Sequence, residues 1–268
     1  RPLDEVVAEC RRLVESGVRE VTLLGQNVNS YGNDLSGVDF ADLLRAVNDI
    51  DGLLRIRFVT SHAASLDERQ MRAMAELPKV CEYLHLPIQS GSDRILKLMN
   101  RGYSAGEYLG KLERLRQYLP DVSLSGDMIV GFPQETEEDF QRTLDVMRDV
   151  RYETLFAFAY SPRPHTRAAQ LADDVSREVK LERLGRLLDL QKVITREANR
   201  AYQGRRVEVL VDGRARRDDE MQGRTRSNKI VNFPGSQDMV GTMVKVEIVA
   251  AYQNSLKGRL LTDDPKSL

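Results

Sequence analysis

Residues 84–92 read LHLPIQSGS, an apolar run that ends at a proline and continues into an amide, two serines and a glycine. Because Pro87 has no backbone N–H to donate, a strand through residues 80–86 cannot simply continue past it. Residues 24–32, LGQNVNSYG, end another short apolar run in the same polar, glycine-containing way. Since α/β proteins bind their ligands at the ends of their strands, the two stretches together predict one ligand-binding rim.

Apolar strands alternate with amphipathic helices through the first three quarters of the chain. The helical segments carry apolar residues three and four positions apart, and the strands are short apolar runs. This alternation predicts an α/β fold of about five parallel strands joined by crossover helices. The predicted strands are residues 21–24, 54–59, 80–86, 122–130 and 154–160.

The pattern changes after a long helical segment that ends near Ala201. Gly204 closes that helix, and alternating apolar residues then indicate strands at 206–211, 229–233 and 243–248. We therefore predict two domains, an α/β core at residues 1–203 and a small all-β module at residues 204–268.

Composition and charge limit the class of protein. Hydrophobic residues make up 41% and charged residues 30% of the chain, as in a globular domain with a substantial core. No apolar run is long enough to span a bilayer, so we expect no membrane partner. The scarcity of cysteine makes a disulfide framework very unlikely and favours a cytoplasmic protein. The net charge is −1, but residues 204–268 carry 12 Lys and Arg against 9 Asp and Glu.

Cysteine and histidine give no sign of a metal site. The two cysteines, Cys10 and Cys81, are far apart in the sequence and form no C-x-x-C motif, which favours small core residues over a disulfide framework. The three histidines, His62, His85 and His165, lack the spacing of metal ligands. From these residues we expect no metal-ligating residue in this chain.

Several polar residues near strand ends are candidates for ligand binding. Gln89 can donate and accept hydrogen bonds, which suits an amino-acid-like ligand, whereas Ser92 could equally cap the next helix. Gly126 and Asp127 interrupt an apolar strand, where a glycine often marks a close approach and a buried carboxylate needs a partner. Gly25, Gln26 and Asn27, taken alone, are most simply a tight turn.

The β module carries a dense set of basic residues, including Arg205, Arg206, Arg224, Arg226 and Lys229. A charged surface on such a module is usually just solvated. Small β-barrels also bind oligonucleotides, and arginine fits the geometry of phosphate, so we favour RNA binding here.

Three segments resemble the radical S-adenosylmethionine (SAM) methylthiotransferases: GQNVNSYG at 25–32, HLPIQSGS at 85–92 and DMIVGFPQET at 127–136. In the tail, GRTRSN at 223–228 and NSLKG at 254–258 are similar to the TRAM domain, a small RNA-binding barrel. The resemblance covers nearly the whole chain. Residues 26–31 resemble the MiaB-type branch, which modifies tRNA, more than the branch that modifies a ribosomal protein.

The resemblance implies a fold and a reaction. The fold would be a partial (β/α) barrel followed by a small antiparallel β-barrel. The reaction would attach a methylthio group to C2 of N6-isopentenyladenosine at position 37 of tRNA. One SAM would supply the methyl group, and a second would be cleaved reductively at a [4Fe–4S] cluster to give a 5′-deoxyadenosyl radical. A second [4Fe–4S] cluster would deliver sulfur, and the partners would be the tRNA anticodon stem-loop and an electron donor.

The same resemblance suggests roles for individual residues. Gly25, Gln26 and Asn27 would border the SAM pocket, and Gln89 and Ser90 would approach its methionine part or the substrate. The residues expected near its adenosine part are Gly126, Asp127, Ile129 and Gly131. RNA would be bound by Arg205, Arg206, Arg224, Arg226, Lys229, Asn254 and Lys257.

The chain departs from the family pattern in one respect. The C-x-x-x-C-x-x-C loop of the radical cluster is absent, as is the N-terminal domain with its own three cysteines. Since Cys10 and Cys81 cannot replace them, we expect the chain as given to be a fragment that holds no cluster and is inactive. Two alternatives stay open: the same chemistry on a ribosomal protein, and a non-catalytic RNA-binding protein.

Overall fold

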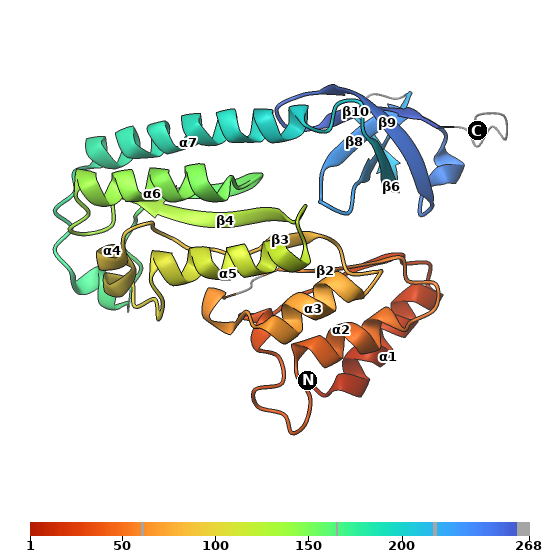
Figure 1. Cartoon of the computed structure of the whole chain (residues 1–268), viewed down its shortest axis with the longest axis horizontal. Helices are drawn as coiled ribbons and strands as arrows, with labels where there is room; N and C mark the ends of the chain where they lie inside the picture. Colours follow the sequence, from red (N-terminus) through yellow and green to blue (C-terminus); the bar gives the residue numbers. More distant parts are fainter. Residues whose placement is uncertain (60–61, 165, 217–218, 262–268) are drawn as a thin grey trace.

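Five parallel strands form the centre of the α/β domain in the computed structural model, which describes residues 1–59, 62–164, 166–216 and 219–261 (Figure 1). One pair joins β1 and β2, and a second sheet has the order β3-β4-β5. A parallel bridge between Ile56 and Val80 links the two sheets. The predicted partial barrel of about five strands is confirmed. The strands are β1 (Glu20–Leu23), β2 (Arg55–Phe58), β3 (Tyr83–His85), β4 (Ser123–Val130) and β5 (Thr154–Ala159).

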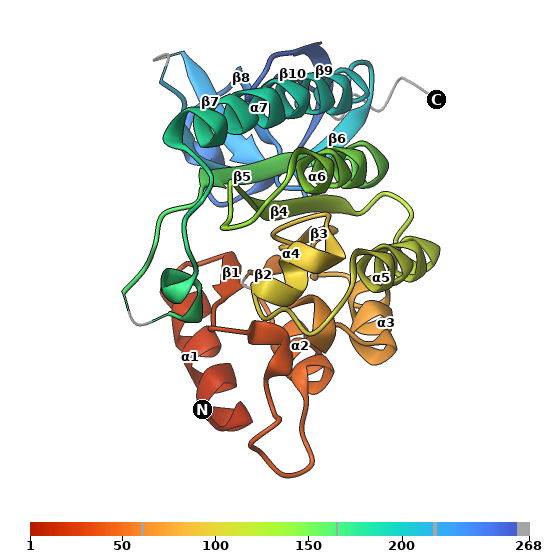
Figure 2. The same ribbon diagram turned by 90° about the vertical axis from the view of Figure 1, so that its left-hand side faces the viewer.

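Helices connect successive strands and cover the outer face of the sheet (Figure 2). Along the chain, each long helix packs on the next, so the layer follows the curve of the strands. The helices are α1 (Leu3–Glu15), α2 (Phe40–Asn48), α3 (Glu68–Glu76), α4 (Asp93–Leu98), α5 (Ala105–Tyr118), α6 (Glu137–Val150) and α7 (Arg177–Arg200). Short 3-10 turns are η1 (Val28–Ser30), η2 (Ala63–Ser65), η3 (Arg167–Gln170) and η4 (Gln237–Met239).

Local sequence signals determine where several helices begin. Asp39, Ser104 and Thr136 cap α2, α5 and α6, each accepting a hydrogen bond from the backbone N–H three residues later. In all three helices the acidic side chain at that third position bonds back to the cap residue, completing a capping box.

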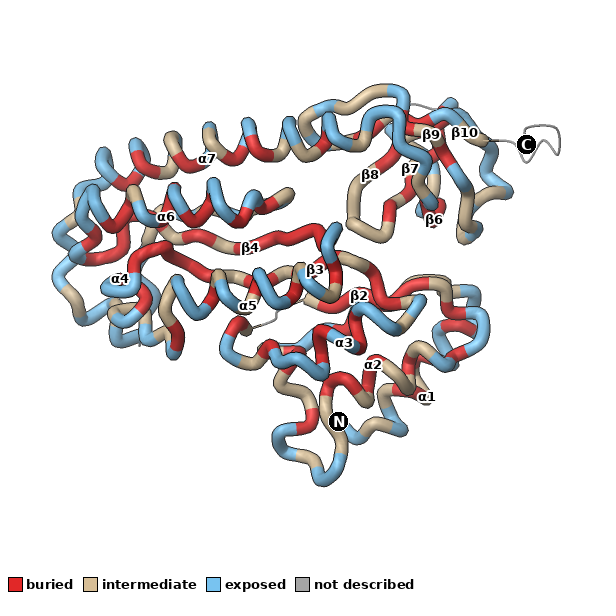
Figure 3. The backbone as a smooth tube through the Cα atoms, in the orientation of Figure 1, coloured by how far each residue is buried: buried red, intermediate tan, exposed pale blue. Residues whose placement is uncertain are grey.

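The core of the α/β domain lies between the strands and the helices, and the strands and the inner sides of the helices are marked as buried in Figure 3. Tyr108 of α5 and Tyr152 are both buried, and their hydroxyl oxygens lie 2.6 Å apart. Burial raises the pKa of both phenols. A Cβ atom on Gly126 would lie 2.9 Å from the Tyr152 ring, so the glycine in β4 leaves room for this tyrosine.

The C-terminal module is a closed five-stranded barrel with strand order β10-β8-β7-β6-β9. Four of its strand pairs are antiparallel, and the β8–β10 pair is parallel. Five strands cannot alternate direction all the way round a closed ring, so one parallel pair is unavoidable. The predicted small β-barrel is confirmed, with this pair as a detail that the sequence pattern did not predict. Its strands are β6 (Arg206–Arg214), β7 (Glu220–Arg224), β8 (Ile230–Pro234), β9 (Met243–Ala251) and β10 (Leu256–Leu260).

Arginines hold the small barrel against the α/β domain. Arg57 of β2 donates to the carbonyl oxygens of Arg226 and Thr225, at 2.9 and 2.8 Å. Arg55, fully buried, donates to the carbonyl oxygens of Arg224 and Glu208. The side chain of Arg226 reaches back to Glu82 and to the carbonyl oxygen of Pro78. Each domain therefore donates hydrogen bonds from its arginine side chains to oxygen atoms of the other domain.

Candidate active site

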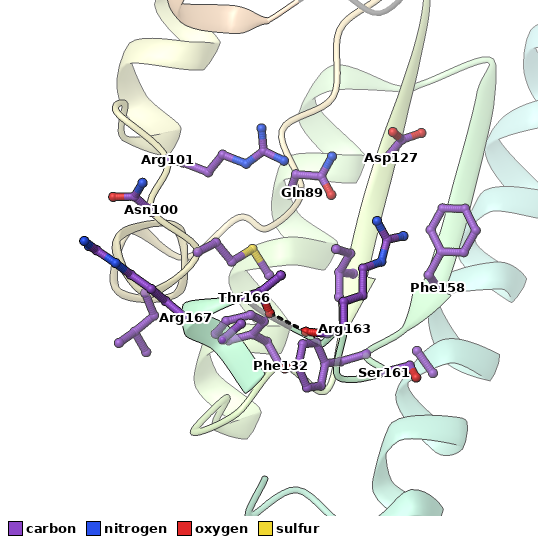
Figure 4. A pocket seen from close by; sticks show the side chains of 16 residues that line it. Gln89, Asn100, Arg101, Asp127, Phe132, Phe158, Ser161, Arg163, Thr166 and Arg167 are labelled. Carbon is purple, nitrogen blue, oxygen red and sulfur yellow. Dashed lines mark hydrogen bonds between the residues drawn. The ribbon is translucent and has the colours of Figure 1, made fainter. Parts of the chain in front are cut away.

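A cavity of about 670 Å³ lies at the carboxyl ends of β4 and β5 (Figure 4). Gln89, Asp127 and Ile129 line it from the sheet, and Phe132 and Tyr160 line it from the loops that follow the strands. The rings of Phe132 and Tyr160 meet edge to face, with centroids 5.0 Å apart. The volume lies within the range of about 300–1000 Å³ that is typical of small-molecule sites.

Gln89 has a strained backbone and connects the loop of the HLPIQSGS motif at 85–92, called the motif loop below, to the sheet. Its φ is 81°, a left-handed backbone conformation that residues other than glycine rarely adopt. Its N–H donates to the carbonyl oxygen of Asp127 at 3.0 Å, and its own carbonyl oxygen accepts from Ile129 N–H at 2.9 Å. These two hydrogen bonds hold Gln89 in its unfavourable backbone conformation. Backbone strain of this kind is often found at functional sites.

A second hollow, of about 550 Å³, adjoins the first and shares Gln89, Arg101 and Asp127 with it. Gln26 and His85 line this hollow as well. The Nδ1 atom of His85 lies 2.9 Å from the hydroxyl of Ser125, and its Nε2 lies 3.6 Å from Asp127 Oδ1. The ends of β1, β3 and β4 thus contribute to one continuous rim.

The structure brings together four of the predicted cofactor residues: Gln26, Gln89, Asp127 and Ile129 line the two connected hollows. Gly25, Asn27, Ser90, Gly126 and Gly131 are not among the lining residues. Their part in cofactor binding stays a prediction, and the structure gives each of them a contact within the chain.

Those contacts fasten the loops around the rim. The side-chain amide of Asn27 donates to Ser30 and Ser65, while Gly25 lies close to Val28. Ser90 is fully buried, and its hydroxyl accepts a hydrogen bond from the N–H of Ser92.

Gly131 also helps to fix a loop of the rim, at the end of β4. It adopts a positive φ of 67°, and a Cβ atom there would lie 2.3 Å from Lys180. Its N–H donates to Glu135, which is buried and ion-paired with Arg183 at 2.8 Å. This contact ties the turn after β4 to α7.

Sequence reasoning missed the basic residues of the cavity. Arg101, Arg163 and Arg167 line it and form no ion pair with any described residue (Figure 4). The signal that could have found Arg163 is its place in SPRP at 161–164, directly after the predicted strand 154–160. The cavity therefore offers several guanidinium groups and one carboxylate, that of Asp127.

Asp139 anchors the motif loop to the first turn of α6. Ser92 donates to its carboxylate at 2.6 Å, and Arg94 and the N–H of Thr136 bond to the other oxygen. Burial alone would raise the pKa of Asp139, but these hydrogen bonds outweigh it and hold the pKa well below its usual range. A charged Asp139 is therefore the stabilising form.

Asp139→Asn should lower the free energy of unfolding by about 1.5–3 kcal/mol at pH 7, because it removes charge-assisted hydrogen bonds. Since the folded-state pKa is depressed, this contribution is present above the unfolded pKa of about 3.9 and is lost as the pH falls towards the folded value. Urea unfolding of both proteins at pH 7 and near pH 3 measures the effect. A stability gap that is as wide in acid as at pH 7 would contradict it.

The predicted RNA-binding residues fall into separate environments. Arg226 is bonded across the domain interface, and Lys257 is ion-paired with Glu220. Arg205 lies over the Tyr202 ring, and Arg206 is exposed. The others line a groove between the two domains: Arg224, Lys229 and Asn254. None of these placements tests RNA binding.

The described residues do not fit an iron–sulfur cluster. No group of three or more His, Cys, Asp and Glu side chains among them could hold a metal ion. Cys10 and Cys81 are both buried, and burial raises the pKa of each thiol, which disfavours the thiolate form that binds iron. His165 lies outside the described residues.

Fold and site together define a partial β/α barrel with a cavity at the carboxyl ends of its strands, the position where proteins of this fold bind their ligands. Residues 1–147 match the radical SAM superfamily, and residues 200–261 match the TRAM domain. The chain therefore belongs to the radical SAM superfamily. None of its described helices is both long and apolar enough to cross a membrane.

Curated relatives match almost the whole chain. A protein from Geobacter sulfurreducens named tRNA-2-methylthio-N(6)-dimethylallyladenosine synthase is 50% identical over 98% of the chain. A protein of the same name from Syntrophus aciditrophicus is 49% identical over 98%. The chain spans only 59% and 58% of the lengths of these two relatives.

Solved structures support the fold alone. Coproporphyrinogen III oxidase from Escherichia coli aligns with a TM-score of 0.54 at 14% identity, covering 97% of this chain and 65% of the other. The radical SAM methyltransferase TsrM from Kitasatospora setae aligns with a TM-score of 0.51 at 21% identity, covering 63% and 33%.

Proposed function

We propose that this chain supplies the SAM-binding and RNA-docking parts of a cytoplasmic tRNA methylthiotransferase. The enzyme would modify C2 of N6-isopentenyladenosine at position 37, in the anticodon stem-loop. The observation that carries the proposal is the 50% identity, over 98% of the chain, to a relative named for this product. A TRAM match next to a β/α barrel with a cavity at its rim supports it further.

The side chains of the cavity suit SAM, which supplies the methyl group when it is bound. SAM carries a carboxylate, an ammonium group, ribose hydroxyls and an adenine ring. Arg101 and Arg163 offer donors for the carboxylate, and Asp127 offers an acceptor for the ammonium or the hydroxyls. Phe132 and Tyr160 offer an aromatic wall for the adenine. The chain's own residues would thus bind and orient the cofactor.

The substitution Gln89→Gly should change the affinity for SAM while leaving the free energy of unfolding nearly unchanged. Glycine adopts a positive φ without strain, so the variant should unfold within about 1 kcal/mol of the parent protein. The cavity loses the Gln89 amide, and affinity for SAM should fall roughly tenfold, the equivalent of one hydrogen bond to a buried ligand. Equilibrium dialysis with labelled SAM and a urea titration measure the two effects. Unchanged SAM affinity would remove Gln89 from the site.

The reaction is tested by mass spectrometry of nucleosides from digested tRNA. Cells that lack the gene should lose 2-methylthio-N6-isopentenyladenosine and accumulate the unthiolated nucleoside, and the complete gene should restore the modification. An unchanged nucleoside profile would contradict the proposal and favour a ribosomal-protein substrate or a non-catalytic role in RNA binding.

A further inference from the structure

His62 follows β2 at the rim and lines the second hollow, together with Gln26, Arg101 and Asp127. Its Nδ1 atom accepts a hydrogen bond from the backbone N–H of Ala64 at 3.3 Å. An imidazole nitrogen that accepts such a bond carries no proton, so the proton of the neutral ring lies on Nε2. No described residue accepts a hydrogen bond from this Nε2–H, and it is therefore available to a ligand of the hollow.

Burial and positive neighbours keep the His62 ring in its neutral form. Lys111 donates to the carbonyl oxygens of Ala63 and Ala64, in the same turn as His62. Burial, followed by the charges of Arg101 and Lys111, holds the pKa of His62 below its ordinary value of about 6.5. The remaining titratable side chains that line the hollow are Tyr83, His85 and Asp127. A neutral imidazole with one donor is therefore the form present at pH 7.

Neighbouring loops fix both the backbone and the ring of His62. The side-chain amide of Asn29, a buried residue in the loop after β1, accepts from the His62 N–H at 3.0 Å and donates to the His62 carbonyl oxygen at 3.2 Å. The Tyr103 ring meets the imidazole edge to face, with centroids 5.4 Å apart. The Tyr103 hydroxyl is shared between the carbonyl oxygens of Pro87 and Ile88. His62 is thus tied to the loop after β1 and to the motif loop.

The rest of the second hollow suits a flat heteroaromatic ring with a polar edge. Val59, Pro87 and Phe156 provide apolar surface, which ligand pockets offer to the faces of such rings. Gln26 provides an amide that both donates and accepts hydrogen bonds. A neutral N–H donor matches an uncharged acceptor such as a purine ring nitrogen, whereas the guanidinium group of Arg101 is the better match for an anionic group.

We propose that His62 donates from Nε2 to a ring nitrogen of an adenine bound in the second hollow, and that Asn29 and Tyr103 are positioning residues for it. The inference rests on the proposed function for the source of this ring, because that function supplies two, the adenine of SAM and the adenine of the target nucleoside. A purely structural His62 would only cap the turn by accepting from the Ala64 N–H. The two roles use different ring nitrogens, so substitutions can separate them.

Two substitutions, made in the protein expressed from its complete gene, each keep the function of one ring nitrogen. Asparagine accepts hydrogen bonds from the backbone two residues on, so His62→Asn retains the cap but is too short to replace the Nε2 donor. Glutamine carries an N–H group at about the distance of Nε2, so His62→Gln retains the donor and weakens the cap. Adenine binding should fall roughly tenfold in His62→Asn, as expected for one lost hydrogen bond, and His62→Gln should keep most of it.

Urea unfolding of the same proteins should give the opposite order, with His62→Asn more stable than His62→Gln. A purely structural role would give one order in both measurements, because binding would then follow the stability of the turn. Equilibrium dialysis with labelled SAM and steady-state kinetics with unthiolated tRNA measure binding to the two sources of adenine.

The outcomes separate this inference from the proposed function. Weaker SAM binding in His62→Asn than in His62→Gln assigns the ring to SAM. Unchanged SAM affinity with a raised KM and an unchanged kcat for tRNA in His62→Asn assigns it to the target nucleoside. His62→Asn values like those of the parent in both assays, or an equal loss in His62→Gln, overturn the inference. If the parent protein does not modify tRNA, the proposed function fails on that result alone, and SAM dialysis decides the inference: a loss in His62→Asn upholds it and unchanged affinity overturns it.

Discussion

Arg57→Met should lower the free energy of unfolding by about 3–5 kcal/mol, because it breaks a buried ion pair and leaves three groups without their partner. The Arg57 side chain is 6% exposed, and its Nε lies 3.0 Å from Glu20. Its two terminal nitrogens donate to the carbonyl oxygens of Thr225 and Arg226. Methionine has a similar volume but cannot replace any of these contacts. Urea unfolding monitored by circular dichroism measures the change.

The same substitution should loosen the small barrel from the α/β domain. Trypsin should then cleave faster near Arg205 and Arg206, where the chain passes between the domains, and mass spectrometry of the fragments locates the cut. Arg45→Met is a matched control, since Arg45 is 40% exposed and pairs with Asp42 at 3.5 Å. It should change stability by no more than about 0.5 kcal/mol. An Arg57→Met protein as stable and as resistant to trypsin as the control would contradict the role of Arg57 at the interface.

Some features of the site could be predicted from sequence because they depend on neighbouring residues in the chain. Strand ends are visible as apolar runs that stop in polar residues, and this placed Gln26 and Gln89 on one rim. Asp127 was a candidate for another local reason, since it interrupts an apolar strand. Alternation along a strand is equally local. It implies that Gly126 and Asp127 face opposite sides of β4, as the structure shows, with Gly126 against Tyr152 and Asp127 in the cavity.

Other features depend on groups that are far apart in sequence and often on backbone atoms. The basic run that includes Arg226 predicts a phosphate-binding surface, yet Arg226 bonds to Glu82, 144 residues away, and to the carbonyl oxygen of Pro78. A carbonyl oxygen has the same chemistry at every position, so no pattern of residue types reveals such a partner. The groove has the same origin, since it forms only when α7 and the small barrel meet.

Gly91→Ala should be the most damaging small substitution in the motif at 85–92, at about 3 kcal/mol or more, because the new Cβ has no room. It would lie 2.3 Å from the carbonyl oxygen of Arg142 and 2.6 Å from the Cα atom of Thr143, both in the backbone of α6. The Gly91 N–H also donates to the Thr143 hydroxyl at 2.9 Å, so the loop cannot move away without losing that bond. Gln89, two residues earlier, would shift with the loop.

The expected result is therefore a double loss, of stability in a urea titration and of SAM affinity in equilibrium dialysis. Gly110→Ala is the matched control: Gly110 lies inside α5, and a Cβ there would meet no atom within 4 Å. It should raise stability by about 0.5–1 kcal/mol, since alanine favours a helix over glycine. If Gly91→Ala were as stable as the parent protein, α6 would have to yield at Arg142, and the close packing that holds Gln89 at the rim would not be needed. We expect the opposite, because the atoms that the methyl group would strike belong to the backbone of a helix held in place by Phe140 and Leu144 in the core.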